Sequence, residues 1–561
     1  MAHTLKELAD LIFPDVTGTL EDLEKRYPER NLPEGAEVTR FAPSPTGFLH
    51  TGSLFTSLVS SKVANQSKGV FFMRLEDTDQ KREIAGSGDD LIRQMHLFGI
   101  DPDEGYMGSS APEKGNYGPY VQSKRADIYK ICIKYLLLND LAYPDFATQE
   151  ELNELREVQT ANRVVPGYYG EYAKYRYLSV DEAYQKIVDG TPYVIRFKSH
   201  GNHENFIICH DEIRGDLRLP ENDQDVVIMK SDGLPTYHFA HVCDDHFMRT
   251  TVVTRGEEWI ASWPIHVELF KAMGFKLPKY AHLPVIMKLD NGNKRKLSKR
   301  KDPEAAVSYF MEQGYPAEGI VKYLMTIANS NFEEWMIGNP GKDYHEFQFS
   351  FNKMSLDGAL FDLEKVRYIC KETLAYYSKE KISEEATKWA KTYDPKLLSY
   401  INRDPKMFEA IMNIERGGEK PRKDYEKYSD ITPRIRFFYH DEHLKMIEEL
   451  DGKLPFNPAF DKEETKSILR EFLDSMDYSI DQTAWFGNLK EIGAKHGFAE
   501  SFKIWKKNKE SYKGHVGDVA GMIRIAVTTS AQSPNLYDVL HILGKDEVTF
   551  RIENAIKSLD K

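Results

Sequence analysis

The stretch Arg40 to Ser53, RFAPSPTGFLHTGS, decides how the N-terminal part of this 561-residue chain is expected to fold. The residues at 38–41 have the pattern of a strand, and those at about 51–66 have the pattern of a helix. Gly47 and Gly52 in the intervening loop allow a ligand to approach the backbone closely. The following helix N-terminus offers free amides and a positive dipole end. The stretch therefore predicts the opening of a βα unit that can bind a phosphate.

Strands and helices continue to alternate along the chain, as in a doubly wound parallel sheet. We expect a strand at Val70 to Leu75 and a helix near Asp89 to Phe98. The pattern resumes with a strand at Val226 to Lys230, a helix near Tyr237, a strand at Thr251 to Thr254, a helix through Trp259 to Met273 and a strand at Leu283 to Met287. After about residue 300, amphipathic helical segments dominate. Ligands of such sheets bind at the carboxyl ends of the strands.

Composition is ordinary for a folded protein, with 41% hydrophobic and 29% charged residues. The apolar runs are too short to span a bilayer, and the N-terminus lacks the features of a secretion signal. The four cysteines have no CxxC spacing, which disfavours a disulfide framework and a cysteine-built zinc site. We therefore expect a cytoplasmic protein with no membrane role.

The net charge of −13 by itself argues against a polyanionic partner. Basic clusters nevertheless occur at Lys294 to Lys301 and at Lys503 to Lys509. Taken alone, each cluster is best interpreted as a solvated charged face. Local positive patches on an acidic body therefore remain an open alternative.

Residues 42–47 (APSPTG) and 49–52 (LHTG) together resemble the first signature of class I aminoacyl-tRNA synthetases, in the form found in bacterial glutamyl-tRNA synthetases. The resemblance implies that His50 is catalytic and that Ser44, His50 and Gly52 bind ATP. Ser53 departs from the final histidine of that signature, so only the role of the first histidine is carried over.

The segment 296–300 (KLSKR) resembles the second class I signature, usually written KMSKS. The resemblance implies that Lys296 and Lys299 are catalytic and that Lys299 binds ATP. Two lysines on a mobile loop can neutralise the charge that develops during attack at the α-phosphorus. Glu258 and Trp259 resemble the residues that flank adenosine in this family.

The resemblance also implies a pocket for glutamate, whose two carboxylates match two guanidinium groups. Arg40 and Arg255 resemble the family arginines, with Arg40 favoured for the side-chain carboxylate. Glu76 resembles the acceptor of the α-ammonium group, and His241 stands where relatives often have asparagine. The full predicted set is Arg40, Ala42, Ser44, Glu76, Tyr237, His241 and Arg255.

The implied fold class is α/β: a doubly wound parallel, Rossmann-type catalytic domain with an α+β acceptor-binding insertion, a stem-contact region and an all-α C-terminal anticodon-binding domain. The expected segments are an extension of unassigned role (1–35), the first catalytic half (36–117), the insertion (118–230), the second catalytic half (231–290), the KLSKR loop with the stem-contact region (291–370) and the anticodon-binding domain (371–561). Some relatives place zinc cysteines where Asp145 and Ala147 stand, so we expect no structural zinc and no other protein-bound metal.

The expected function is activation of glutamate with ATP and transfer to the 3′ end of tRNA(Glu). The expected partners are tRNA(Glu), L-glutamate and ATP, with Mg²⁺ accompanying ATP and the chain acting as a monomer. Relatives generally need bound tRNA before they activate glutamate. The alternatives are a glutaminyl-type or non-discriminating synthetase, a catalytically silent tRNA-binding homologue and a small-molecule nucleotidyltransferase.

Overall fold

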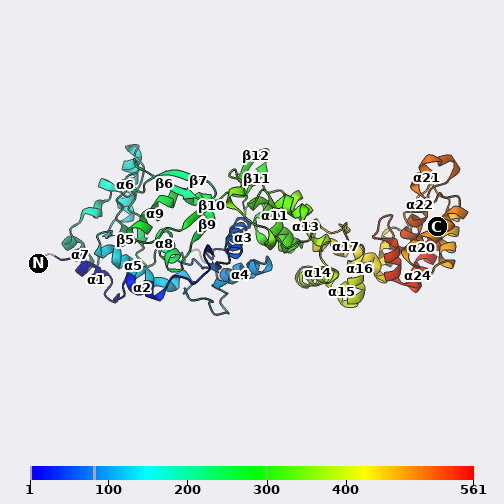
Figure 1. Cartoon of the computed structure of the whole chain (residues 1–561), viewed down its shortest axis with the longest axis horizontal. Helices are drawn as coiled ribbons and strands as arrows, with labels where there is room; N and C mark the ends of the chain where they lie inside the picture. Colours follow the sequence, from blue (N-terminus) through cyan, green and yellow to red (C-terminus); the bar gives the residue numbers. More distant parts are fainter. Residues whose placement is uncertain (1–2, 80–83, 299, 561) are drawn as a thin grey trace. The chain divides into compact units, whose positions relative to one another are not determined.

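The computed structural model describes residues 3–79, 84–298 and 300–560. The chain forms two compact units (Figure 1), one made of residues 1–310 and 320–363 and the other of residues 311–319 and 364–561. The boundary therefore runs through helices α10 (Val307–Gln313) and α11 (Ala317–Ala328). In the described part of the chain, all strands belong to the first unit.

The first unit is an α/β unit. Its strands are β1 (Val38–Phe41), β2 (Val70–Met73), β3 (Glu104–Gly105), β4 (Ala142–Asp145), β5 (Val194–Phe197), β6 (Phe206–Asp211), β7 (Gly215–Pro220), β8 (Val227–Met229), β9 (Val252–Gly256), β10 (Lys279–Leu283), β11 (Met287–Asp290) and β12 (Asn293–Lys296). Its other helices are α1 (Leu5–Ile12), α2 (Leu20–Arg26), α3 (Thr51–Gln66), α4 (Ser87–Leu97), α5 (Ala126–Leu138), α6 (Gln149–Ala161), α7 (Val180–Val188), α8 (Tyr237–Phe247), α9 (Trp263–Ala272) and α12 (Phe332–Gly338).

The parallel strands come from two distant parts of the sequence. Strands β1, β2 and β3 pair in parallel, and so do β9 and β10. The two sets lie side by side, because the amide of Thr251 donates to the carbonyl of Val38 at 2.9 Å. The two sheets have the orders β1-β2-β3 and β7-β6-β10-β9, and the contact between β1 and β9 places the parallel strands in the order β3-β2-β1-β9-β10. The sequence order of the strands changes direction between β1 and β9, the position where doubly wound sheets bind ligands. The predicted parallel sheet is confirmed.

The two faces of β1 are covered by different helices, as the alternation of side chains along a strand requires. Thr39 donates to the carbonyl of Ser60 on α3 at 2.8 Å. Arg40 points the other way and bonds Asp245 on α8 at 3.1 Å. Val38, on the same face as Arg40, belongs to a hydrophobic core that also contains residues of α5 and α8. The sheet is therefore packed between helices (Figure 1).

Two predicted strands differ from the structure. The run 226–230 does contain β8, but β8 pairs antiparallel with β5 inside the insertion and does not join the parallel sheet. The predicted strand at 283–287 is wrong, because β10 ends at Leu283 and the next strand begins at Met287. Pro284 follows β10 directly, and a proline cannot donate a ladder hydrogen bond.

The extension before residue 36 forms part of the core of the first unit. Thr4 and Thr19 begin α1 and α2 with capping boxes. Phe13 and Tyr27 are 5% and 1% exposed and belong to the same buried cluster as α5. Arg30 donates to the carbonyl of Met248 at 3.2 Å. The extension therefore packs against α5 and forms a hydrogen bond at the end of α8.

In its described residues, the second unit contains helices and no strands. Its helices are α13 (Leu363–Ala375), α14 (Lys379–Tyr393), α15 (Pro395–Arg403), α16 (Pro405–Asn413), α17 (Ile431–Ile435), α18 (His440–Glu449), α19 (Lys462–Asp474), α20 (Gln482–Lys495), α21 (Phe502–Lys507), α22 (Val516–Thr528), α23 (Leu536–Leu543) and α24 (Lys545–Ser558). Asp394 and Asp404 cap α15 and α16, and each is followed by proline at the first helical position. The helices pack around two buried clusters.

Arg30 provides a test of the structural role of the extension. Arg30 lies 3.0 Å from Glu104 and 3.8 Å from the ring centroid of Tyr117, and its side chain is 6% exposed. We predict that Arg30→Ala lowers the free energy of unfolding of the first unit by about 3 kcal/mol, because Glu104 loses its cationic partner in a largely buried site and keeps the hydroxyl of Tyr120. Calorimetry should show this as a fall of several degrees in the melting temperature.

Arg26→Ala is the matched control. Arg26 pairs with Asp127 at 2.8 Å, but the two side chains are 48% and 53% exposed. Such a pair contributes at most about 1 kcal/mol. If both substitutions lowered the melting temperature equally, Arg30 would not have the stabilising role proposed for it.

Candidate active site

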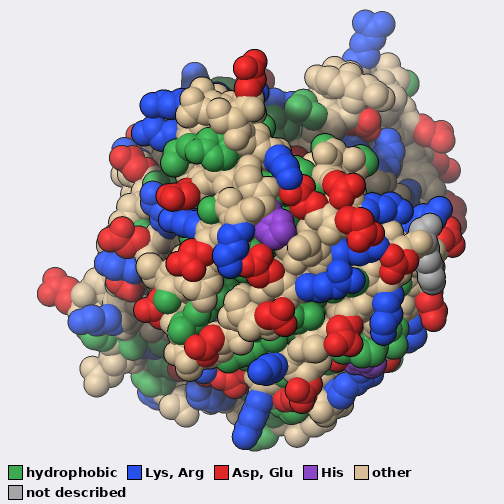
Figure 2. Space-filling view, turned by 90° about the vertical axis from the view of Figure 1, so that its right-hand side faces the viewer, with side chains coloured by type: hydrophobic (Ala, Val, Ile, Leu, Met, Phe, Trp, Pro, Cys, Tyr) green, Lys and Arg blue, Asp and Glu red, His purple; other side chains and the backbone are tan. Residues whose placement is uncertain are grey.

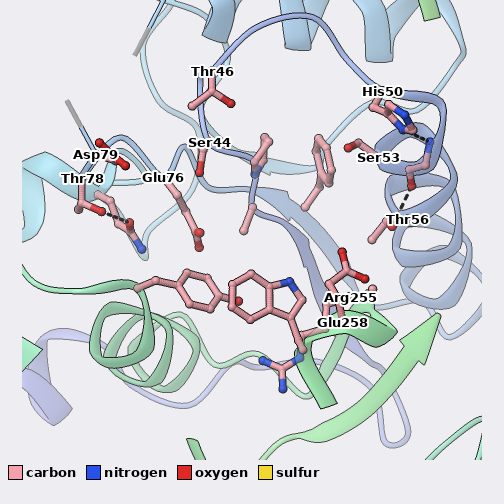
Figure 3. Close-up of a pocket in the computed structure, with 18 of the residues that line it drawn as sticks. Ser44, Thr46, His50, Ser53, Thr56, Glu76, Thr78, Asp79, Arg255 and Glu258 are labelled. Carbon is pink, nitrogen blue, oxygen red and sulfur yellow. Dashed lines mark hydrogen bonds between the residues drawn. The ribbon is translucent and has the colours of Figure 1, made fainter. Parts of the chain in front are cut away.

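A cavity of about 1420 Å³ opens at the carboxyl ends of β1 and β9, at the switch point of the sheet. Figure 3 shows residues of the first loop, Glu76, Arg255 and Glu258 arranged around it. Of the predicted site residues, the following line this cavity: Arg40, Ala42, Ser44, His50, Gly52, Glu76, Tyr237, Arg255, Glu258, Trp259 and Lys296. The structure therefore brings the two signature segments and the β9 arginine together. Lys299 lies outside the described residues.

The first signature loop holds His50 at the start of α3. His50 is the N-cap residue, and its Nδ1 accepts a hydrogen bond from the amide of Gly52 at 2.9 Å. In the neutral ring the proton is therefore on Nε2. A Cβ at position 52 would lie 3.2 Å from Nδ1 of His50, so glycine keeps room for the imidazole. Gly47 has a φ of +136°, which disfavours any side chain there.

The second signature begins at Lys296, the last residue of the hairpin β11–β12. Asp302 holds the loop that follows through hydrogen bonds. The Asp302 carboxylate accepts from Arg295 at 2.6 and 2.8 Å and from the amide of Ser298 at 2.9 Å. Lys288 lies 3.2 Å from the same carboxylate. The hydrogen bonds from Arg295 hold the pKa of Asp302 well below its usual range. Leu297, 2% exposed, anchors the loop from inside.

Asp302→Asn tests whether this ion pair fixes the loop. Loss of the charged acceptor should cost the local fold about 1.5 kcal/mol, so trypsin should cut within 294–300 roughly ten times faster. Timed proteolysis followed by mass spectrometry measures this rate.

Asp290→Asn removes the other carboxylate that pairs with Arg295, at 2.6 Å and with 39% exposure. This exposed partner should matter much less. If Asp290→Asn loosens the loop as much as Asp302→Asn does, Asp302 is not the anchor.

Arg40, predicted to bind a glutamate carboxylate, already has an acidic partner. Its Nε lies 3.1 and 3.2 Å from the carboxylate oxygens of Asp245, and its Nη1 donates to the carbonyl of Thr254 at 3.2 Å. Asp245 also accepts from Arg74 at 2.7 Å. Burial would raise the pKa of Asp245, but Arg40 and Arg74 hold it well below its ordinary value.

Glu76 reaches the cavity just beyond the end of β2 (Figure 3). Arg74 donates to one of its oxygens at 2.9 Å. Burial raises the pKa of Glu76 above its ordinary value in spite of that arginine. A cationic group entering the cavity would favour the ionised form of this carboxyl.

Within the described parts of the chain, Arg255 is held by histidines and not by a carboxylate. Its Nη1 lies 3.0 Å from Nδ1 of His266, and its Nε donates to Nε2 of His282 at 3.0 Å. Its guanidinium carbon lies 4.8 Å from the ring centroid of Tyr280. Neither histidine is among the site residues predicted from the sequence. The position of His282, near the carboxyl end of β10, is the signal that would have identified it.

His241 was predicted to contact substrate, but it is not among the residues that line the cavity. It is fully buried, with Nδ1 2.9 Å from Asp245 and Nε2 3.0 Å from the hydroxyl of Tyr280. Burial lowers the pKa of His241 to about 4, against the influence of Asp245. Its position behind the wall suits a supporting role.

Tyr237 and Trp259 form an aromatic part of the wall. Their ring centroids are 4.3 Å apart. Burial raises the pKa of Tyr237, so its hydroxyl stays protonated at neutral pH. A flat apolar face beside charged groups suits a heteroaromatic ring linked to phosphates.

No group of three or more His, Cys, Asp or Glu residues within 3–79, 84–298 and 300–560 is arranged to hold a metal ion. Asp145, at one of the positions considered for zinc in the sequence, accepts from Arg196 at 2.6 Å and from Tyr168 at 2.7 Å. In the structure, Asp145 is therefore the partner of an arginine. None of the described helices is long and apolar enough to cross a membrane.

Comparisons with known proteins show what the chain is similar to. The family model described as tRNA synthetases class I (E and Q), catalytic domain, matches residues 37–355, and the model described as Anticodon binding domain matches residues 421–556. A Glutamate--tRNA ligase of Clostridium perfringens (strain 13 / Type A) is 49% identical over 547 residues, which cover 98% of this chain and 100% of that protein. One of Clostridium beijerinckii is 47% identical over 554 residues, covering 99% and 100%.

A solved structure gives the same result. The crystal structure of a glutamate tRNA ligase from Elizabethkingia meningosepticum, in complex with its amino acid, is 28% identical to this chain with a TM-score of 0.72. The match covers 93% of this chain and 99% of that one.

Proposed function

Since the chain belongs to the class I tRNA synthetases of the E and Q type, we propose that it is a glutamate–tRNA ligase. In the first step the α-carboxylate of glutamate attacks the α-phosphorus of ATP, giving glutamyl adenylate and pyrophosphate. In the second step the terminal ribose hydroxyl of tRNA(Glu) attacks the acyl carbon and releases AMP. The observation that carries this proposal is the convergence of His50, Lys296 and Arg255 on one cavity.

The phosphate end of the cavity is assigned to the two signatures. His50, with its proton on Nε2, would donate to a phosphate oxygen, and Ser44 and Gly52 would lie along the triphosphate. Lys296 and Lys299 would neutralise the charge that develops as pyrophosphate leaves. Glu258 and Trp259 would flank adenosine. Positioning and charge stabilisation supply the acceleration, and no side chain acts as a nucleophile.

The amino acid end is assigned to Glu76 and Arg255. Glu76 would receive the α-ammonium group, since its carboxyl reaches the cavity wall. The charge of Arg40 is already matched by Asp245. We therefore assign the side-chain carboxylate of glutamate to Arg255, in place of the expectation that favoured Arg40. Tyr237 and the loop residues Ala42 and Ser44 complete this end of the cavity.

Further parts of the proposal concern partners. Mg²⁺ would enter with ATP, held mainly by phosphate oxygens and water. The helical second unit, much of which matches the anticodon-binding model, would contact tRNA. Figure 2 shows basic and acidic side chains interspersed over one face of the molecule, so phosphates would meet local basic positions on an acidic body. The enzyme would act as a cytoplasmic monomer.

Charging of purified tRNA tests the proposal. With labelled glutamate and ATP, we predict esterification of tRNA(Glu) and glutamate-dependent pyrophosphate exchange when tRNA is present. Charging with glutamine instead would identify a glutaminyl-type enzyme. Tight tRNA binding without charging would identify a silent homologue. Charging of tRNA(Gln) with glutamate would identify a non-discriminating enzyme.

Lys296→Ala tests the role assigned to the second signature. We predict that turnover falls by about 100-fold, because a positioned charge on the transferring phosphoryl group is lost, while tRNA affinity stays near that of the wild type. Single-turnover kinetics and filter binding measure the two quantities. Lys299→Ala should behave in the same way.

Lys294→Ala is the control, because Lys294 is an exposed residue of the same strand β12 and does not line the cavity. Its removal should leave turnover unchanged. Unchanged turnover in Lys296→Ala would remove this lysine from the mechanism.

A further inference from the structure

The contacts of Arg255 differ in kind from those of the other arginine in the cavity wall. Arg40 has a carboxylate partner, whereas Arg255 has two imidazoles, from His266 on α9 and His282 on β10. Arg255 is 5% exposed, and both histidines are fully buried. Among the described residues, no carboxylate oxygen lies within 4 Å of its guanidinium nitrogens.

The hydrogen-bond directions fix the protonation of both rings. A guanidinium only donates, so each imidazole must accept with an unprotonated nitrogen. His282 can do so because its Nδ1 is 2.7 Å from Asp211, which places the ring proton there. His266 can do so because its Nε2 is 2.9 Å from Nδ1 of His238. Both rings that hold Arg255 are therefore neutral.

The neighbouring carboxylates are already engaged elsewhere. Asp211 accepts from His282 and from the amides of two loop residues. Asp245 pairs with Arg40 and Arg74. The positive charge of Arg255 is therefore not compensated by a direct partner.

One nitrogen of Arg255 is also left over. Its Nη2 is buried and makes no hydrogen bond to any residue that the structure describes. A buried donor without a partner costs about 1 to 3 kcal/mol. Arg255 lines the cavity, so its uncompensated charge lies at the wall of the space where a ligand binds.

We propose that His266 and His282 are positioning residues that aim Arg255 at the substrate side chain while leaving its charge for the substrate to neutralise. This inference rests on the proposed function. It makes these two histidines determinants of the preference for glutamate over glutamine. Neutral acceptors fix the guanidinium, and only a carboxylate ligand completes its charge balance.

A carboxylate in place of the neutral His266 would have a different effect on substrate binding. A carboxylate at position 266 would fix Arg255 equally well, but it would satisfy the positive charge internally. Glutamate would then compete with a protein carboxylate. Glutamine would no longer leave an uncompensated cation in a closed site, so its penalty would shrink.

Two substitutions of equal shape separate position from charge. His266 accepts with Nδ1, and the side-chain oxygen of asparagine or aspartate occupies a similar place on a shorter side chain. His266→Asn keeps a neutral acceptor, and His266→Asp adds a negative charge with the same geometry. The glutamate KM, the ATP KM and kcat are measured in tRNA charging, together with kcat/KM for glutamine.

We expect His266→Asn to keep the glutamate KM within about threefold of wild type. We expect His266→Asp to raise it by about tenfold or more, which corresponds to about 1.4 kcal/mol. The ATP KM should be unchanged in both variants. The ratio of kcat/KM for glutamate to kcat/KM for glutamine should fall only in the aspartate variant. A purely structural role would affect the two variants alike.

Equal glutamate KM values and equal glutamine discrimination in the two variants would overturn the inference. If His266→Asp fails to fold, as judged by its thermal transition, His282→Gln and His282→Glu repeat the test from the other side, because His282 accepts with Nε2. If the wild type charges no tRNA with glutamate, the proposed function fails. Calorimetric titration of glutamate into the wild type and both variants then judges the histidines independently, and equal affinities would overturn their role.

Discussion

The buried carboxylate of Asp245 is the point on which the first unit depends. It lies on α8 and pairs with Arg40 of β1 and with Arg74, which follows β2. These contacts join segments about 170 and 205 residues apart in the chain. Removing one member of such a network leaves an unpaired buried charge and costs about 3 to 5 kcal/mol. Asp245 thereby fixes the switch point of the sheet where the cavity opens.

The same network distributes charge within the cavity. Asp245 neutralises Arg40, whereas Arg255, at the end of the neighbouring strand β9, has no acidic partner among the described residues. Asp302 has the corresponding role in the second signature, where it engages Arg295 and leaves Lys296 on the cavity wall. In both places a buried aspartate pairs with an arginine, and a second basic side chain nearby is left to bind the substrate.

Local signals in the sequence predicted local structure well. The strand at 38–41 and the helix at 51–66 have the predicted limits, because proline and glycine residues punctuate the loop between them. The run 226–230 was recognised as extended, but its partner strand could not be known from its own residues. At 283–287 the apolar run masked the effect of Pro284. The predicted residues that line the cavity were found through motif resemblance, whereas His266 and His282 contact Arg255 only in the folded chain.

The separation between the two sets of parallel strands also bears on synthesis at the ribosome. Strand β1 emerges early, but its neighbour β9 begins only at Val252. One side of β1 therefore stays unpaired while more than two hundred further residues are translated. Exposed strand edges invite pairing with other chains, and long-range pairing is slow. The nascent first half is the stage at which this protein most needs protection from aggregation, and slow translation before residue 252 would prolong that exposure.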